Sequence, residues 1–437
     1  MGEVVHVAGI GGVGMSAVAQ ALLDQGAAVT GSDRLLDGGD MTETLACLAR
    51  QGVRLFPQDG SGVTSRTARL VVSSAIEADN PEVTRAAALG VPVAHRAAEV
   101  ARAVRGRRLV AVTGTCGKSS VTALLGGLLE GAGFDPLVVN GAAVAGWDAG
   151  GTRVGSVRKG GGEWAVVEAD ESDKSLMVFS PEHAVITNAS ADHFGMEETQ
   201  ALFAAFRARV PGVVVDGRGE AGGPEGMRLE GWDGFFTHEG TEYRVPMPGA
   251  HNVWNAWHAV RMARALGAAP ERLAAALAGF GGVERRLQRV GTCGGAAVVD
   301  DYAHNPEKLG AAWATLAAAF SAGVCAVWRP HGYAPLRKML GGLAEAFGRV
   351  CRPADTLLLL PVYDAGGTAD RSVGSEDLAS LLREKGVTVL TVRTLEEAEA
   401  RMREKAVSGG ALVTFGARDP GLPRLARRLA ERESSES

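Results

Sequence analysis

Glycine-rich turns between an apolar run and a helical pattern most constrain how this chain can fold. The first follows Val4–Ile10, with a helix predicted through Met15–Leu23, and the second follows Leu109–Val112, with a helix over Val121–Leu129. A third apolar run, Ala296–Val299, leads through a polar turn into another helical stretch. Alternating strands and helices of this kind are typical of parallel sheets with helices on both faces. The sequence therefore predicts an α/β protein.

The length of 437 residues exceeds what one hydrophobic core usually organises, so we expect several domains. Candidate linkers lie near Arg105–Arg108 and Glu284–Gly291. They predict a Rossmann-like N-terminal domain (1–106), a central domain of the P-loop ATPase type with a mostly parallel sheet (107–288), and a Rossmann-like C-terminal domain (289–437).

Composition excludes several classes of protein. Hydrophobic residues make up 46 % and charged residues 22 %, and the net charge of −5 does not favour binding to nucleic acid. The amino terminus has no pattern of a signal peptide, and no apolar run approaches the ~20 residues of a membrane span. Five scattered cysteines without a Cys-x-x-Cys pair favour neither a zinc site nor a disulfide framework. We expect a cytoplasmic enzyme that is a monomer or a weak homodimer.

The first glycine-rich turn, Gly9–Gly14, has the pattern G-x-G-x-x-G between a strand and a helix. Its glycines allow a diphosphate to approach the helix N-terminus, where free N–H groups favour an anion. Asp33 ends the next predicted strand, Ala28–Ser32, about where an acid would meet a ribose hydroxyl. The pattern indicates a nucleotide diphosphate, although a dinucleotide cofactor or a turn without a ligand would also fit.

The second turn, Gly114–Ser120, is the stronger signal. Backbone N–H groups near its glycines can surround phosphate oxygens, Lys118 can neutralise them, and the Ser119 hydroxyl can reach Mg²⁺. The spacing misses the strict G-x-x-x-x-G-K-[S/T] pattern because residue 112 is Val112. The order of strand, loop and helix nevertheless predicts a phosphate site, the alternative being a lysine in a structural turn.

Acidic and histidine residues follow two further predicted strands. Glu168 opens a run of four carboxylates directly after the strand Trp164–Val167, where hard oxygen ligands suit Mg²⁺. The strand Ala184–Thr187 is followed by Asp192-His193. Taken alone, the acidic run could be a solvated loop, and the Asp-His pair is more often a cap or a surface pair.

Three later features are also site candidates. Asn252 and Asn255 lie three apart at the start of a predicted helix, so their amides share a face and could bind an adenine edge or phosphate, or only cap the helix. Arg286, at the second linker, could close onto a γ-phosphate, although paired arginines are usually just exposed. The polar turn Asp300–Pro306 follows a strand, which is a typical position for a binding site.

Together these motifs resemble the Mur ligase family over nearly the whole chain. The residues that carry the resemblance are Gly114-Thr-x-Gly-Lys-Ser119, Glu168 with Asp192-His193, His251-Asn-x-x-Asn255, Arg286 and Asp301-Tyr-Ala-His-Asn-Pro306. Gly9–Ser16, Ser73–Ile76, Asp79–Glu82 and Glu168–Asp173 are most similar to the branch that joins L-alanine to UDP-N-acetylmuramate. The resemblance implies an ATP- and Mg²⁺-dependent ligase of peptidoglycan precursor synthesis. Such an enzyme forms an amide bond between small-molecule substrates through an acyl-phosphate intermediate.

The resemblance also implies roles for individual residues. The N-terminal domain would bind a UDP-sugar through Gly11, Gly12, Gly14, Met15, Asp33, Ser73, Ser74, His95 and Arg96. ATP would contact Gly114, Thr115, Gly117, Lys118, Ser119, Ser120, Asn252, Asn255, Arg286 and Asp301. Ser119, Glu168 and His193 would bind metal, Lys118, His193 and Arg286 would be catalytic, and Tyr302, His304 and His331 would face the incoming amino acid.

The sequence departs from the alanine-adding branch at positions that bear on the amine. Cys116 stands where the branch usually has His, and the segment after His331 lacks arginines that the branch carries there. L-alanine is the first expectation. The alternatives are a muropeptide-recycling ligase, another amino-acid ligase, or a non-catalytic nucleotide-binding partner subunit. A dehydrogenase would leave Lys118, Glu168 and His193 without a role.

Overall fold

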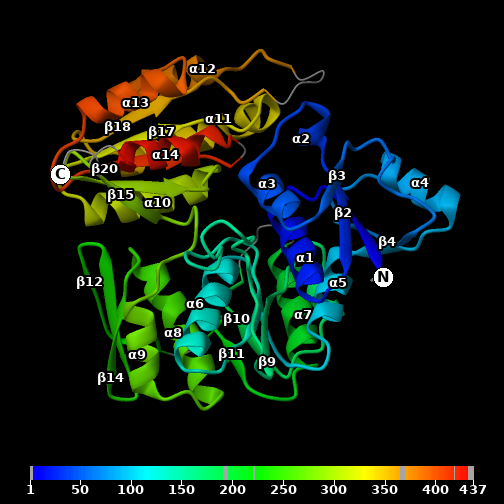
Figure 1. The fold of residues 1–437 in the computed structure, drawn as a ribbon. Coiled ribbons are helices and arrows are strands. Elements are labelled where there is room, and N and C mark those ends of the chain that lie inside the picture. Colours follow the sequence, from blue (N-terminus) through cyan, green and yellow to red (C-terminus); the bar gives the residue numbers. More distant parts are fainter. Residues whose placement is uncertain (1–2, 190–194, 220–221, 365–369, 418, 432–437) are drawn as a thin grey trace. The chain divides into compact units, whose positions relative to one another are not determined.

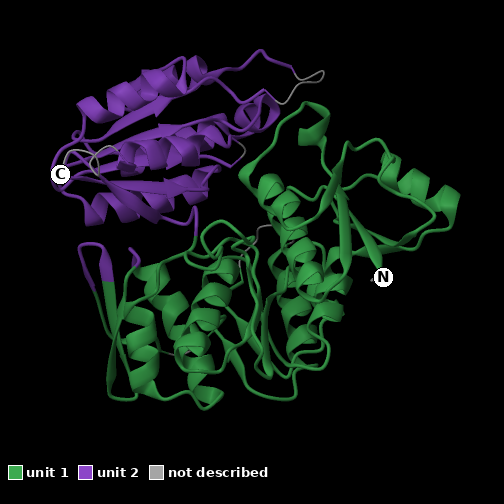
Figure 2. Cartoon of the chain, viewed as in Figure 1, with its two compact units in different colours: residues 1–228, 234–246, 250–283 green, residues 229–233, 247–249, 284–437 purple. Residues whose placement is uncertain are grey.

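The structure is a computed structural model that describes residues 3–189, 195–219, 222–364, 370–417 and 419–431 (Figure 1). These residues form two compact units (Figure 2). Unit 1 holds residues 1–228, 234–246 and 250–283, and unit 2 holds residues 229–233, 247–249 and 284–437. None of the helices in the described part of the chain is long and apolar enough to cross a membrane.

The N-terminal part of unit 1 is a five-stranded parallel sheet in the order β3-β2-β1-β4-β5. Its strands are β1 (Val4–Ala8), β2 (Ala28–Ser32), β3 (Arg54–Phe56), β4 (Thr67–Val72) and β5 (Val93–His95). Its helices are α1 (Val13–Asp24), α2 (Arg34–Asp37), α3 (Glu43–Arg50), α4 (Pro81–Leu89) and α5 (Arg96–Ala103). The predicted first strand and helix are confirmed as β1 and α1, with Ile10 lying in the glycine-rich turn.

Helix α4 shows how local sequence sets these boundaries. The Asn80 side chain accepts a hydrogen bond from the Glu82 N–H, and Pro81 stands at the first helical position, where its missing N–H costs nothing. Gly90 ends the helix in the left-handed conformation, with φ of 67°.

The central part of unit 1 contains a six-stranded sheet in the order β11-β10-β6-β9-β7-β8, in which only β8 runs antiparallel to its neighbour. Its strands are β6 (Arg108–Thr113), β7 (Leu137–Val139), β8 (Val157–Arg158), β9 (Trp164–Glu168), β10 (His183–Ile186) and β11 (Val214–Asp216). Its helices are α6 (Lys118–Gly131), η1 (Ser175–Val178), α7 (Met196–Arg207), α8 (Ala250–Ala265) and α9 (Pro270–Ala278). A smaller sheet contains β12 (Glu225–Glu230), β13 (Asp233–His238) and β14 (Thr241–Val245).

Unit 2 is built on a six-stranded sheet in the order β15-β16-β20-β17-β18-β19, parallel except for β15. Its strands are β15 (Gln288–Cys293), β16 (Ala296–Asp301), β17 (Val324–Trp328), β18 (Thr356–Leu359), β19 (Val389–Thr391) and β20 (Ala411–Phe415). Its helices are α10 (Pro306–Ala319), α11 (Tyr333–Val350), α12 (Ser375–Glu384), α13 (Leu395–Glu404) and α14 (Gly421–Glu431).

The predicted linker Glu284–Gly291 is wrong in its second half. Gln288 begins β15, which pairs antiparallel with β16 at the edge of the sheet. An edge strand tolerates polar and charged side chains, so its composition resembles that of a loop.

The hydrophobic cores follow the sheets. In unit 1, one cluster of buried side chains runs from Val5 and Val18 in the N-terminal part to Val139 and Ile186 in the central part. Two clusters cover the two faces of the sheet in unit 2. The predicted α/β class with three mostly parallel sheets is confirmed, whereas the exact boundaries of three domains stay a prediction.

Candidate active site

The loop between β6 and α6 requires glycine at two positions. Gly114 and Gly117 have φ of 132° and 84°, which side-chain-bearing residues rarely adopt. A Cβ on Gly114 would lie 2.1 Å from Thr187 Oγ1, and one on Gly117 would lie 2.6 Å from Asn255 Oδ1. The loop therefore packs against the end of β10 and the start of α8, and it exposes backbone N–H groups at the N-terminus of α6.

Two residues after β10 hold this loop in place. Thr187 Oγ1 donates to the Cys116 carbonyl oxygen (2.6 Å), and so does the Asn188 amide (3.0 Å). Asn188 Oδ1 accepts from the Cys116 N–H (2.9 Å) and from the Thr115 hydroxyl (2.7 Å). The sequence places Asn188 after a strand but carries no signal for this clamp, which was not predicted.

Lys118 lies among carboxylates. Its Nζ donates to Glu171 Oε2 (2.7 Å) and to the Gly114 carbonyl oxygen (2.9 Å), and it lies 4.0 Å from Asp170 Oδ1. Burial lowers the pKa of Lys118, but the nearby carboxylates, Glu171 first, outweigh burial and raise it overall. Lys118 therefore stays a cation at neutral pH, as a phosphate-binding lysine must. Glu171 belongs to the predicted acidic run but was not predicted as a site residue.

The candidate metal ligands in the described residues provide hard oxygen atoms. Glu168 ends β9, and its Oε2 accepts from the Gly141 N–H (2.7 Å); Ser119 lies in the first turn of α6 and is almost fully buried. No group of three or more His, Cys, Asp or Glu with metal-binding geometry occurs in the described part of the chain. Asp192 and His193, the remaining candidates, lie outside the described residues. A hydroxyl and a carboxylate fit Mg²⁺, which prefers oxygen ligands and keeps several waters.

Asn252 and Asn255 lie in the first turns of α8 and are both largely buried, with their amides 3.5 Å apart (Nδ2 of Asn255 to Oδ1 of Asn252). Helix α8 packs beside α6 (Figure 1). This packing brings Asn255 against the phosphate loop at Gly117.

Asp33, which follows β2, accepts hydrogen bonds from the backbone of the first glycine-rich loop and of α2. Its Oδ2 accepts from the Gly11 N–H (2.8 Å) and its Oδ1 from the Leu35 N–H (3.0 Å), which caps α2. The carboxylate is 8 % exposed and joins the glycine loop to the next strand. Its role toward a ribose stays a prediction.

Arg96, in the first turn of α5, brings a cation against this loop. A Cβ on Gly14 would lie 2.8 Å from Arg96 Nη1, so the guanidinium packs over the loop. Arg96 Nη2 donates to Asp170 Oδ2 (2.9 Å). Next to it, His95 Nε2 lies 3.5 Å from Asp173, and the Ser74 hydroxyl donates to the same carboxylate (3.3 Å). The structure thus brings most predicted UDP-sugar residues to one place; Ser73 is in the adjoining turn, and Met15 is buried in α1.

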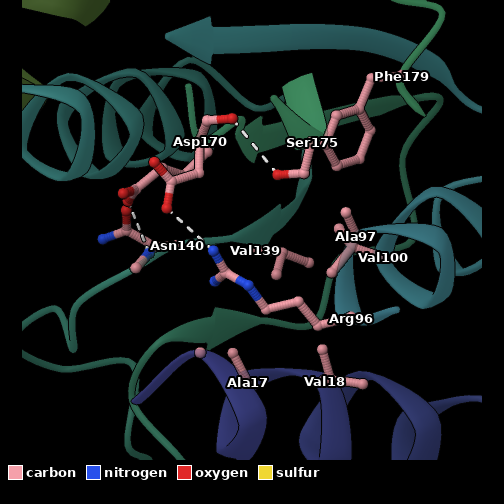
Figure 3. A pocket seen from close by; sticks show the side chains of 13 residues that line it. Ala17, Val18, Arg96, Ala97, Val100, Val139, Asn140, Asp170, Ser175 and Phe179 are labelled. Atoms are coloured by element: carbon pink, nitrogen blue, oxygen red, sulfur yellow. Dashed lines mark hydrogen bonds and ion pairs between the residues drawn. The ribbon is translucent and has the colours of Figure 1, made fainter. Parts of the chain in front are cut away.

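A small pocket has Arg96 and Asp170 in its lining (Figure 3). It is lined by Gly14, Ala17, Val18, Arg96, Ala97, Val100, Val139, Asn140, Gly141, Glu168, Asp170, Ser175 and Phe179. Glu168 and Gly14 both line it, so it connects the glycine loop with a candidate metal ligand inside unit 1.

The remaining predicted residues meet in unit 2. Asp301 ends β16, and its two oxygens accept from the N–H groups of Leu287 and Ala303, both at 2.7 Å. Burial raises the pKa of Asp301 to about 6. The turn that it holds has φ of 58° at Arg285 and 45° at Leu287, with the exposed Arg286 between them.

The aromatic candidates form a row of edge-to-face contacts. The ring centroids of Tyr302 and His304 lie 5.4 Å apart, and those of His304 and His331 lie 5.1 Å apart. Both pairs are arranged edge to face. The Arg286 guanidinium lies 5.8 Å from the centre of the Tyr302 ring. Arg286, Asp301, Tyr302, His304 and His331 therefore form one polar and aromatic group.

Comparison with known proteins decides the family. Family models described as "Mur ligase family, catalytic domain" and "Mur ligase, glutamate ligase domain" match residues 4–108 and 285–418. The UDP-N-acetylmuramate–L-alanine ligase of Cereibacter sphaeroides is 33 % identical over 94 % of this chain and 93 % of its own length. That of Rhizobium meliloti is 35 % identical over 87 % of both chains. The chain belongs to the Mur ligase family.

Solved structures agree with this assignment. The UDP-N-acetylmuramate-alanine ligase MurC from Thermotoga maritima has a TM-score of 0.81 at 25 % identity and covers 99 % of both chains. A murein peptide ligase from Psychrobacter arcticus shares the fold, with a TM-score of 0.67 at 19 % identity. Like other Mur ligases, this chain is an ATP-dependent enzyme that joins an acid to an amino acid.

Proposed function

We propose that this Mur ligase joins an amino acid to the carboxylate of UDP-N-acetylmuramate in a reaction driven by ATP. L-Alanine is the first candidate for the amino acid. The observation that carries the proposal is the phosphate loop, where Lys118 lies among the carboxylates that follow β9. The names of the relatives that match nearly the whole chain supply the substrates.

The chemistry has two steps. A carboxylate oxygen of the sugar attacks the γ-phosphorus of ATP, the bond to the bridging oxygen breaks, and ADP leaves. The amine then attacks the acyl carbon, loses a proton, and expels inorganic phosphate. Lys118 and Arg286 would stabilise negative charge on the transferring phosphoryl group, and Asn252 and Asn255 would orient the nucleotide.

Ser119, Glu168 and His193 would hold Mg²⁺, whose positive charge stabilises the phosphates of bound ATP. Ser119 and Glu168 match the oxygen ligands that this ion prefers. The Thr115, Gly117 and Ser120 backbone would contact phosphate oxygens at the N-terminus of α6.

The UDP-sugar would bind at the first glycine loop. Gly11, Gly12 and Gly14 would face the diphosphate, and Arg96 would neutralise it. Asp33, Ser73, Ser74, Met15 and His95 complete the proposed site. Gly14 of this loop and Glu168 line the same small pocket as Arg96, which supports placing the two ends of the substrate near them.

The amino acid would bind to the group in unit 2 that includes Tyr302, His304 and His331. We accordingly propose three functional domains, for the UDP-sugar (1–106), for ATP (107–288) and for the amino acid (289–437). We also propose a cytoplasmic enzyme that is a monomer or a weak homodimer.

A peptide is the second candidate for the amine. The segment Pro330–Pro335 lacks the arginines that the alanine-adding branch carries just after the His. Without these cations the acceptor region differs from that of the branch, which favours a larger muropeptide as the alternative to L-alanine.

Measurement of ATP-dependent phosphate release distinguishes these functions. The purified chain would be given UDP-N-acetylmuramate with a panel of single amino acids and of short peptides. Release that requires both the sugar and L-alanine supports the proposal, and release only with peptides supports the recycling ligase. No turnover with UDP-N-acetylmuramate and any of these amines would contradict the proposed substrates.

A further inference from the structure

We propose that Glu171 is the counter-ion of Lys118 in the nucleotide-free enzyme, and that it competes with the nucleotide phosphates for this lysine. Glu171 would thus be a positioning residue that sets the affinity for ATP and ADP. The inference rests on the proposed nucleotide site at Gly114–Ser120.

The contact between the two side chains is close and buried. Glu171 Oε2 lies 2.7 Å from Lys118 Nζ, and the Glu171 side chain is only 1 % exposed. Its other oxygen, Oε1, is buried and has no hydrogen-bond partner among the described residues. A buried carboxylate that is satisfied on one side depends strongly on its one cation.

The loop that carries Glu171 is held by its own hydrogen bonds. The Lys174 N–H donates to the Glu171 carbonyl oxygen (3.0 Å), and the Ser172 N–H donates to Asp170 Oδ1 (3.1 Å). The Ser175 N–H donates to Asp173 Oδ1 (2.9 Å). Because the backbone is fixed in this way, the carboxylate cannot withdraw freely when Lys118 turns toward a ligand.

Binding of a phosphate therefore requires an exchange. Lys118 must give up part of its interaction with a buried carboxylate to meet the phosphate oxygens, and Glu171 then stays close to a second anion. Both effects weaken the binding of nucleotide. Gln at position 171 would keep an oxygen that accepts from Lys118, would remove the charge, and would place an amide NH2 where Oε1 lies.

The test compares ADP binding by calorimetry in the full-length wild type and in Glu171→Gln. We expect ADP to bind about five- to tenfold more tightly to the variant. The control is Glu198→Gln on α7, which removes one exposed negative charge that pairs with Lys174 and does not touch Lys118. It should bind ADP as the wild type does.

Two further measurements test whether the buried charge at position 171 is the cause of tighter binding. The gain in Glu171→Gln should persist at about 0.5 M salt, because a buried pair is screened little. Equal or weaker ADP binding by a folded Glu171→Gln, with its unfolding temperature checked, would overturn the inference. If Glu171→Gln does not fold, Glu171→Asp takes its place, because it keeps the charge on a shorter side chain. This variant should bind ADP more tightly than the wild type, with a gain in affinity of less than about tenfold. Unchanged or weaker ADP binding by Glu171→Asp would again overturn the inference. If the wild type itself binds no ADP, the proposed function fails instead.

Discussion

The two glycine-rich loops of unit 1 have the same local architecture but obtain their positive charge differently. Each connects a buried strand to the N-terminus of a helix. The Gly114–Ser120 loop contains its own cation, Lys118, whereas the Gly9–Gly14 loop takes Arg96 from α5. An anion site can thus be completed from within the loop or from a distant segment.

The acids beside the two loops differ in a similar way. Asp33 accepts from two backbone N–H groups and holds the loop itself. Glu171 accepts from the ammonium group and holds the cation. Loss of Asp33 should therefore reduce stability, whereas loss of Lys118 or Arg96 should reduce catalysis or substrate binding.

The largest effect is expected at the cation of the second loop. Lys118→Ala should lower phosphate release about 10³-fold, because it removes a charge that stabilises the transferring phosphoryl group. Its affinity for UDP-N-acetylmuramate, measured by calorimetry, should change little. Turnover near that of the wild type would contradict the role of the loop.

Arg96→Ala tests the cation of the first loop. We expect the KM for UDP-N-acetylmuramate to rise about 10- to 100-fold, since a charged hydrogen bond to the diphosphate is lost. The KM for ATP should stay within about twofold. Arg96→Lys keeps the charge, so its KM for UDP-N-acetylmuramate should lie between those of the wild type and Arg96→Ala. Equal increases in both KM values would mean that Arg96 only supports the fold.

Asn188→Ala tests the residue that holds the second loop in place. Asp33 has the corresponding role at the first loop. The change removes hydrogen bonds to Cys116 and Thr115 and loosens the loop. Steady-state kinetics should show the KM for ATP about tenfold higher, with the KM for the UDP-sugar unchanged. An unchanged KM for ATP would show that Thr187 alone holds the loop.

The sequence predicted both loops because their signals are local. Glycines at fixed spacing between an apolar run and a helical pattern report backbone geometry directly, as the φ of Gly114 and Gly117 show. The contacts of Lys118 with Glu171 and of Cys116 with Asn188 join residues 53 and 72 positions apart. Such pairs depend on which strands become neighbours, and a single sequence does not encode this visibly.

The edge strand β15 and Asp33 show two other limits. Gln288–Cys293 resembles a linker because only one neighbour pairs with it. The sequence indicated the place of Asp33 at the end of β2, yet the hydrogen bond to Gly11 follows from the turn and not from the motif.

Asp33→Ala measures the structural role of the first acid. We expect a loss of about 1–2 kcal/mol in the free energy of unfolding, because one helix cap and one loop N–H lose their acceptor. Thermal or denaturant unfolding of unit 1 would report it. A loss below about 0.3 kcal/mol would show that water replaces the carboxylate without cost.

The smallest expected effect concerns His6, in the strand before the first loop. Burial lowers the pKa of His6 to about 4, while the unfolded chain has an ordinary histidine. As the pH falls, His6 therefore takes up a proton in the unfolded chain before it does so in the folded chain. The free energy of unfolding is highest above about pH 6.5 and decreases as the pH falls toward 4.

Between pH 7.5 and 5.5 the wild type should lose about 1 kcal/mol relative to His6→Gln. The measurement is the difference between the two unfolding free energies across this range. A difference that does not change with pH would mean that His6 has the same pKa in the folded and in the unfolded chain.

The most direct test of the proposed ligase follows an oxygen atom. UDP-N-acetylmuramate labelled with ¹⁸O in its carboxylate would be converted with ATP and L-alanine, and the released phosphate analysed by mass spectrometry. Attack of the carboxylate on the γ-phosphate predicts one ¹⁸O atom in the phosphate for each amide formed. Phosphate without ¹⁸O, released while the amide forms, would contradict the acyl-phosphate route.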